Sequence, residues 1–95
     1  MKKYNSLNDI RKKIDEVDIE ILDLIGERKD LVSQVINFKT RDQIVDKKRI
    51  DKIINRLKKE AKKKDIPNEI IIEIWMAMIQ SFIKYEEKIF DKLEK

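Results

Sequence analysis

The sequence predicts an all-α protein of three helices, long, medium and long, in one domain that spans residues 1–95. One Gly and one Pro among 95 residues leave few positions that favour turns. Lys, Glu, Ile and Leu are abundant, and these residue types suit helices. Apolar residues make up 41% of the chain. They recur three and four positions apart, which is the spacing of one helical face.

The first helix is expected to begin at Ser6, whose hydroxyl suits an N-cap three positions before Asp9. It continues to about Phe38, with Gly26 as its weak point. Such a helix is about 50 Å long, whereas a compact globule of this mass is about 30–35 Å across. We therefore expect a second copy of the chain to cover its apolar face. That face consists of Leu7, Ile10, Ile14, Val17, Ile21, Leu24, Leu31, Val35 and Phe38.

The second and third helices follow a short connection at residues 40–45. Asp46 is a suitable N-cap for the second helix, residues 62–65 look like a solvated helix end and loop, and Pro67 fits the first turn of the third helix. The inner face of the second helix consists of Ile50, Ile53, Ile54, Leu57 and Ala61. The seam of the third helix consists of Ile71, Trp75, Met78, Phe82, Ile89 and Leu93, with Ile79 and Ile83 beside it.

Composition excludes several classes of function. The chain has no Cys and no His, so disulfides, the usual zinc sites and Ser-His or Cys-His nucleophiles are excluded. No leader peptide and no membrane-spanning run is recognisable, so we expect a cytoplasmic protein without a membrane partner. The net charge of +4 favours an anionic ligand. Because 19 acidic residues are interspersed with the basic ones, no nucleic-acid partner is expected.

Five charged residues interrupt or adjoin the apolar faces. Arg28 falls on the seam of the first helix and Glu86 on that of the third, while Lys39 lies eleven residues after Arg28. Arg49 opens the second helix, and Arg11 adjoins the seam of the first. A charge in a core is costly without a partner.

For each basic residue alone, the ordinary interpretation is a stem laid on the core with its head in water. An internal salt bridge between Arg28 and Glu86 is a second ordinary interpretation. Together, four cations and one carboxylate favour a ligand with more than one acidic group. The chain has 18 Lys and five Arg, so an Arg on an inner face suggests that a carboxylate is gripped there. Arg41 and Arg56 have no such explanation and are expected to be solvated.

Two segments carry a family resemblance. They are LNDIRKKIDEVD at residues 7–18 and LIGER at residues 24–28. The pattern I-R-x-x-I-D-x-[IV]-D followed by L-[IL]-x-E-R resembles the all-α (type II) chorismate mutases, a family that includes related isochorismate pyruvate lyases. It continues with a Lys, an Asp before an Arg, and a Gln or Glu in the last helix. The matching residues here are Lys39, Asp46, Arg49 and Glu86.

The resemblance implies an intertwined homodimeric helical bundle with two equivalent sites for chorismate, which is a dianion. It implies that Arg28 and Arg11 of the partner subunit bind the two carboxylates, and that Arg49 supports one of them. The reaction is an intramolecular rearrangement to prephenate, so neither cofactor nor metal is expected. The protein has to restrain the substrate in its compact conformation and stabilise the charge that develops.

The resemblance also implies the catalytic roles. Lys39 approaches the ether oxygen of the breaking bond and the ring hydroxyl, and Asp46 offers a backbone N–H near that hydroxyl. Glu86 faces the ether oxygen and must be protonated to donate a hydrogen bond. We expect activity that falls as Glu86 loses its proton.

Two positions depart from the best-known members of the family. Ile50 stands where many carry a Glu, and Phe82 where many carry a small polar residue. Apolar residues at both positions also occur in isochorismate pyruvate lyases, which usually have Gln at the Glu86 position, so a lyase is the alternative enzyme. A helical dimer that binds protein or nucleic acid through residues 58–64 is the non-enzymatic alternative.

Overall fold

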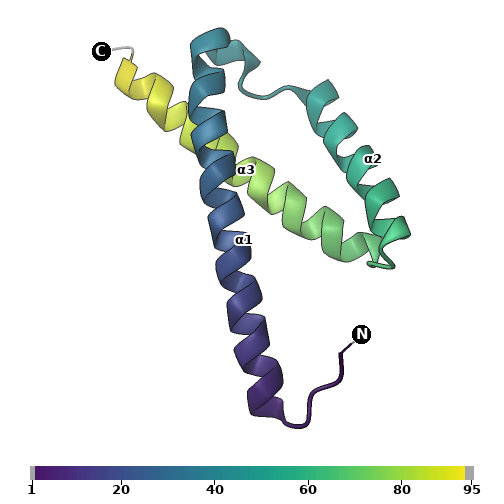
Figure 1. Cartoon of the computed structure of the whole chain (residues 1–95). Helices are drawn as coiled ribbons and strands as arrows, with labels where there is room; N and C mark the ends of the chain where they lie inside the picture. Colours follow the sequence, from purple (N-terminus) through teal and green to yellow (C-terminus); the bar gives the residue numbers. More distant parts are fainter. Residues whose placement is uncertain (1, 94–95) are drawn as a thin grey trace. The chain divides into compact units, whose positions relative to one another are not determined.

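The computed structural model describes residues 2–93, and every regular element within that range is helical. Figure 1 shows them in chain order: α1 (Leu7–Val35), the 3₁₀ turns η1 (Ile36–Phe38) and η2 (Arg41–Gln43), α2 (Lys47–Lys63) and α3 (Asn68–Leu93). The prediction of an all-α chain with a long, a medium and a second long helix is confirmed. Within residues 2–93 no helix is both long and apolar enough to cross a membrane.

Two units divide the chain, residues 1–31 and residues 32–95. The first unit holds most of α1. The second holds the end of α1, both 3₁₀ turns, α2 and α3. The interpretation of residues 1–95 as a single domain stays a prediction.

The start of α1 follows from its cap. The Asp9 backbone N–H donates to the Ser6 hydroxyl at 3.1 Å, and the Ile10 N–H donates to the Ser6 carbonyl at 3.2 Å. The first bond satisfies a donor that the first helical turn leaves without a partner, and the second is the first intrahelical bond of α1. The predicted N-cap is confirmed.

No residue of α1 is buried, although its apolar face runs along its whole length. The predicted face residues are 39% exposed at Val17 and more exposed elsewhere, up to 87% at Phe38. Exposed apolar side chains in a continuous line are unusual on a monomer's surface and typically mark an interface. The exposed apolar side chains of α1 are therefore consistent with the prediction that a second copy of the chain covers this face.

The predicted extent of the first helix is wrong by three residues. The α-helix ends at Val35, and Ile36–Phe38 form a 3₁₀ turn that leads into extended backbone at Lys39, with φ −137° and ψ 161°. The predicted connection at residues 40–45 also contains ordered structure, the 3₁₀ turn Arg41–Gln43. Thr40 caps this turn, since its N–H donates to Gln43 Oε1 at 2.8 Å.

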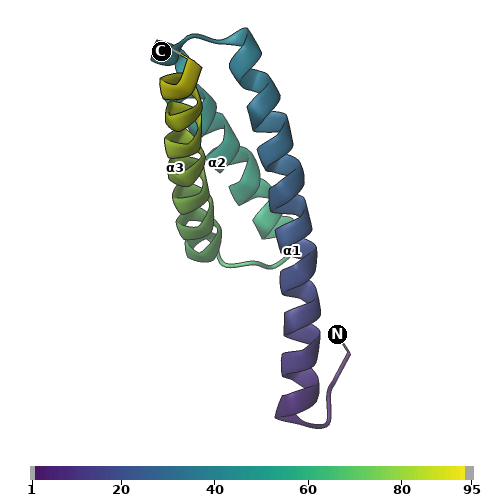
Figure 2. The same cartoon turned by 90° about the vertical axis from the view of Figure 1, so that its left-hand side faces the viewer.

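Helices α2 and α3 pack side by side, as Figures 1 and 2 both show. Asp46 is the N-cap of α2, as predicted, because its carboxylate accepts the Arg49 N–H at 3.0 Å. On the predicted inner face, Ile53 and Ala61 are buried. Its remaining members, Ile50, Ile54 and Leu57, are half-buried.

The turn between α2 and α3 follows from Asp65 and Pro67. Asp65 has φ 57°, in the left-handed region that reverses the chain after a helix. Pro67 immediately precedes α3 and accepts the Ile70 N–H through its carbonyl at 3.2 Å. The predicted helix start is therefore correct to within one residue.

The buried line of α3 differs from the predicted seam. Ile79, Glu86 and Phe90 are buried, whereas Leu93 is 69% exposed. The periodicity alone identifies a broad apolar surface. Which edge of it is buried depends on the segments that pack against α3, and the connection after α1 packs at Phe90. The other predicted seam members are half-buried: Ile71, Trp75, Met78, Phe82 and Ile89.

Candidate active site

A buried ion pair joins the two residues expected to act on the breaking bond. Lys39 Nζ lies 2.8 Å from Glu86 Oε1. Their side chains are 20% and 7% exposed, so this pair is mostly removed from water. The distance is that of an ion pair, but the angles are not those of a hydrogen bond, and Oε1 accepts no hydrogen bond from the described residues. Buried polar atoms in this condition are rare, and catalytic groups are among the places where they occur.

The burial of Glu86 follows from its place on α3. It lies one turn after Phe82 and one turn before Phe90, on the apolar side of the helix. An ionised carboxylate in such a position is very costly without a cation. The sequence identified Glu86 for this reason, and the structure places a cation beside it.

The position of Lys39 follows from the two 3₁₀ turns. It lies in the extended link between η1 and η2, and the buried residues Ile36 and Ile44 flank that link. Both pack in one apolar cluster with Phe90, which holds this segment against the end of α3. The Lys39 side chain, which leaves the link between them, reaches Glu86 one turn before Phe90 on that helix.

Asp46, Arg49 and Ile50 lie together at the start of α2. The Asp46 carboxylate accepts the Arg49 N–H, so capping occupies it, while the Asp46 carbonyl accepts the Ile50 N–H at 3.0 Å. Arg49 is exposed and Ile50 is half-buried. The expectation that Arg49 faces inward is therefore not met within this chain.

The two remaining predicted arginines lie on α1. Arg28 is half-buried, while Arg11 is exposed, as are the apolar residues Ile10 and Ile14 beside it, so the predicted role of Arg11 in the partner's site stays a prediction. Seventeen residues separate the two within one continuous helix. At 1.5 Å per residue their Cα atoms are about 25 Å apart. One chain's Arg11 and Arg28 are thus too far apart to hold one small dianion.

Arg41 was expected to be solvated, and it is exposed, but it also makes contacts that the sequence did not predict. Its Nη2 lies 2.6 Å from Asp91 Oδ1, and its guanidinium lies 5.9 Å from the centre of the Phe90 ring. A second missed contact joins Ser33 Oγ and the Tyr85 hydroxyl at 3.0 Å, next to Glu86 in sequence. The scarcity of Arg in a Lys-rich chain was a usable signal for Arg41. Nothing local in the sequence marks Ser33.

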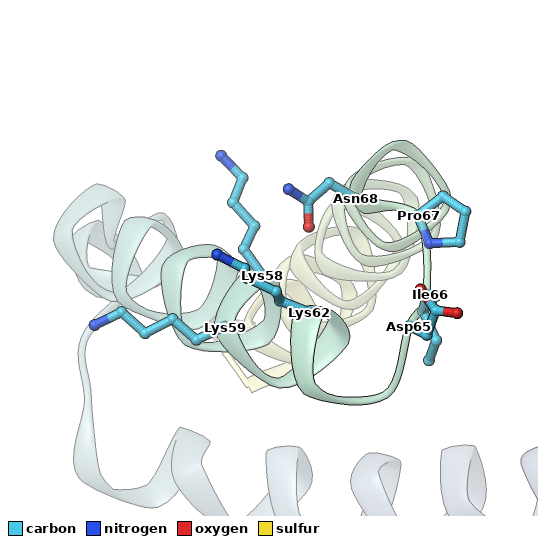
Figure 3. Close-up of a pocket in the computed structure, with 7 residues that line it drawn as sticks. All are labelled: Lys58, Lys59, Lys62, Asp65, Ile66, Pro67 and Asn68. Carbon is cyan, nitrogen blue, oxygen red and sulfur yellow. The ribbon is translucent and has the colours of Figure 1, made fainter.

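A surface hollow lies away from these residues, at the turn between α2 and α3. Figure 3 shows the residues around it, and its volume is about 590 Å³. Three lysines line it, but they are surface cations, and none of the predicted site residues contributes to it. Its lining residues are Lys58, Lys59, Lys62, Asp65, Ile66, Pro67 and Asn68. Within residues 2–93 no group of three His, Cys, Asp or Glu side chains is placed to hold a metal ion.

The profile of the family described as Chorismate mutase type II matches residues 10–87, which is most of the chain. The chain belongs to the type II chorismate mutase family. The match includes every predicted site residue, from Arg11 to Glu86. Membership identifies the chain as an isomerase, a chorismate mutase of aromatic amino acid biosynthesis, and confirms the activity expected from the sequence.

Two relatives are similar over most of the chain. A chorismate mutase of Methanocaldococcus jannaschii is 38% identical over 76 residues, which cover 78% of this chain and 77% of the relative. A bifunctional chorismate mutase/prephenate dehydratase of Aquifex aeolicus is 30% identical over 89 residues, or 87% of this chain. The aligned part is 24% of that longer protein. No solved structure matches the chain significantly.

Proposed function

We propose that the chain rearranges chorismate to prephenate at a site built around Lys39 and Glu86, using cations and one proton donor. The ion pair between these two residues, whose side chains are 20% and 7% exposed, carries the proposal. Chorismate is flexible and doubly negative. Holding it in its compact reactive conformation lowers the barrier by orientation. Stabilising the charge that grows on its ether oxygen lowers it further.

Some of the cations orient the substrate, and others stabilise the charge on its ether oxygen. Arg28 binds one carboxylate with its planar fork, and Arg11 of the partner subunit binds the other. Arg49 supports a carboxylate from the start of α2. Lys39 meets the ether oxygen and the ring hydroxyl, and the backbone N–H of Asp46 meets the same hydroxyl. The contact between Lys39 and the ether oxygen grows stronger as the bond breaks, so it favours the transition state over the substrate. The contacts with the carboxylates hold the substrate in its compact conformation.

Glu86 becomes the proton donor when substrate draws Lys39 toward itself. A carboxylate that faces an oxygen gaining negative charge would repel it, so Glu86 has to be neutral in the complex. Once the Lys39 ammonium turns to the ether oxygen, the buried Glu86 loses its cation partner. A proton then removes the cost of a buried charge and supplies a hydrogen bond to the ether oxygen.

A homodimer completes the site. Arg11 and Arg28 of one chain are about 25 Å apart along α1, so the two carboxylates of one substrate need one arginine from each of two chains. The exposed apolar face of α1 supplies the surface on which the two chains would pack, with residues such as Ile14 and Leu24, 51% and 63% exposed. A symmetric dimer places Arg11 of each subunit in the site of the other.

The decisive experiment is chorismate turnover by the wild type and by Arg28→Ala. We expect prephenate from the wild type, and a fall of about 100-fold or more in kcat/KM for the variant, because a cation that grips the substrate is lost. Arg56→Ala, which removes an exposed arginine of α2, is the matched control and should retain full activity. Equal activities of Arg28→Ala and wild type would exclude this site.

A product assay also distinguishes a chorismate mutase from the alternative enzyme, an isochorismate pyruvate lyase. Ile50 and Phe82 are half-buried apolar residues at positions where a lyase also carries apolar residues. Purified protein given isochorismate would release salicylate and pyruvate if it were a lyase. We expect prephenate from chorismate, and no salicylate from isochorismate.

A further inference from the structure

The segment that carries Lys39 is fixed at both ends. We call residues 36–44 the Lys39 loop; it contains η1, two linking residues and η2. Ile36 and Ile44, 5% and 6% exposed, are buried in a cluster with Phe90 of α3. Apolar burial therefore holds the two ends of the loop, and Lys39 lies between them. The middle of the loop is held by a polar contact, which Arg41 makes with Asp91 of α3.

Arg41 makes two different contacts with the same turn of α3. Its Nη2 lies 2.6 Å from Asp91 Oδ1, and its guanidinium carbon lies 5.9 Å from the centre of the Phe90 ring. A planar guanidinium suits this pair of contacts, because one edge binds a carboxylate while the face lies near an aromatic ring. The two contacts together define the direction of the Arg41 side chain.

The register of these contacts relates Arg41 to the proposed catalytic pair. Phe90 and Asp91 follow Glu86 by four and five residues on α3, which is about one helical turn. Lys39 precedes Arg41 by two residues, and Thr40, which lies between them, caps the turn Arg41–Gln43. We call the contacts of Arg41 with Phe90 and Asp91 the Arg41 tie. On α3 this tie lies one turn after Glu86, the residue that Lys39 contacts.

The tie is too exposed to contribute much to folding. The Arg41 and Asp91 side chains are 41% and 67% exposed, and exposed ion pairs usually contribute little to stability. The buried residues Ile36, Ile44 and Phe90 supply the stability of this region. We therefore expect Arg41 to affect the position of the Lys39 loop more than the stability of the fold.

We propose that Arg41 is a positioning residue: its tie to Asp91 and Phe90 holds the Lys39 loop so that the Lys39 ammonium meets the breaking bond. This inference rests on the proposed role of Lys39. Small misplacements of a catalytic group slow the chemical step while leaving substrate binding by other residues intact. Loss of the tie should thus lower kcat more than it raises KM.

Steady-state kinetics of three variants test this role. Arg41→Gln should lower kcat about threefold to tenfold with a smaller change in KM, since the lost contacts are individually weak. Asp91→Asn should lower kcat less, because the contact with Phe90 remains. Arg41→Lys should recover part of the activity, since an ammonium still pairs with Asp91. Circular dichroism and thermal melting should show that all three variants are folded.

Lys63→Gln is the matched control, because it breaks another exposed ion pair, 3.1 Å from Glu60, away from the Lys39 loop. Its kcat should equal that of the wild type. An unchanged kcat in Arg41→Gln, or a loss confined to melting temperature, would overturn the positioning role and leave the proposed function standing. A wild-type protein that does not convert chorismate would instead remove both proposals.

Discussion

At the scale of single residues, the protonation of Glu86 predicts a pH dependence. A carboxyl group donates a hydrogen bond only in its protonated form, so a donor role for Glu86 predicts activity that falls as pH rises. Glu86→Gln places a neutral donor at the same position at every pH. We expect the wild type to lose activity as pH rises and the variant to keep its activity at higher pH. The measurement is kcat against pH for both proteins.

Glu60→Gln is the control for this substitution. Glu60 is an exposed carboxylate whose pKa lies below its ordinary value, chiefly because Lys63 donates a hydrogen bond to it. It takes no part in the proposed site, so its replacement should leave the pH profile unchanged. Parallel profiles for the wild type and Glu86→Gln would rule out the proton-donor role.

The residues of the proposed site were recognisable in the sequence to the extent that they break a local pattern. Glu86 interrupts an apolar seam, and it also matches the family pattern in the last helix. The sequence did not show which cation pairs with Glu86, because both Arg28 and Lys39 were candidates. Tertiary packing brings Lys39 Nζ to 2.8 Å from Glu86 Oε1. Arg41 was missed because its partner Asp91 is fifty residues away in sequence, and no local rule relates the two.

At the scale of elements, the apolar face of α1 predicts that association and activity fail together. Ile14 lies on that face and is 51% exposed. Ile14→Asp would bury a carboxylate in the expected dimer interface, where an unpaired charge is very costly. We expect the variant to be monomeric in analytical ultracentrifugation at concentrations at which the wild type is dimeric. It should also have lost most of its chorismate mutase activity, since each site would lack its second arginine.

Lys12→Asp is the control, because it introduces the same side chain on the opposite side of the same helix. It should remain dimeric and active. A wild type that stays monomeric at high concentration would contradict the interface on α1. So would an Ile14→Asp variant that dimerises as the wild type does.

Helix starts were predictable because their causes are local. Ser6 and Asp46 each cap a helix with bonds that reach only a few residues along the chain. The end of α1 and the buried edge of α3 were not predictable, because both depend on Ile36, Ile44 and Phe90 meeting from distant parts of the sequence. Periodicity shows that a helix has an apolar surface. It does not show which part of that surface its own chain covers.

At the scale of the whole molecule, the shared site predicts complementation between two inactive variants. In a symmetric dimer of Arg11→Ala with Arg28→Ala, one site receives both intact arginines and the other receives neither. Random exchange of subunits makes about half of the dimers mixed, each with one working site, so activity should return to about a quarter of the wild-type level. The assay is chorismate turnover after the two variants are mixed and allowed to exchange. Each variant incubated alone is the control and should stay inactive. A mixture that also stays inactive, although exchange is verified by mass spectrometry, would mean that Arg11 does not serve the partner's site.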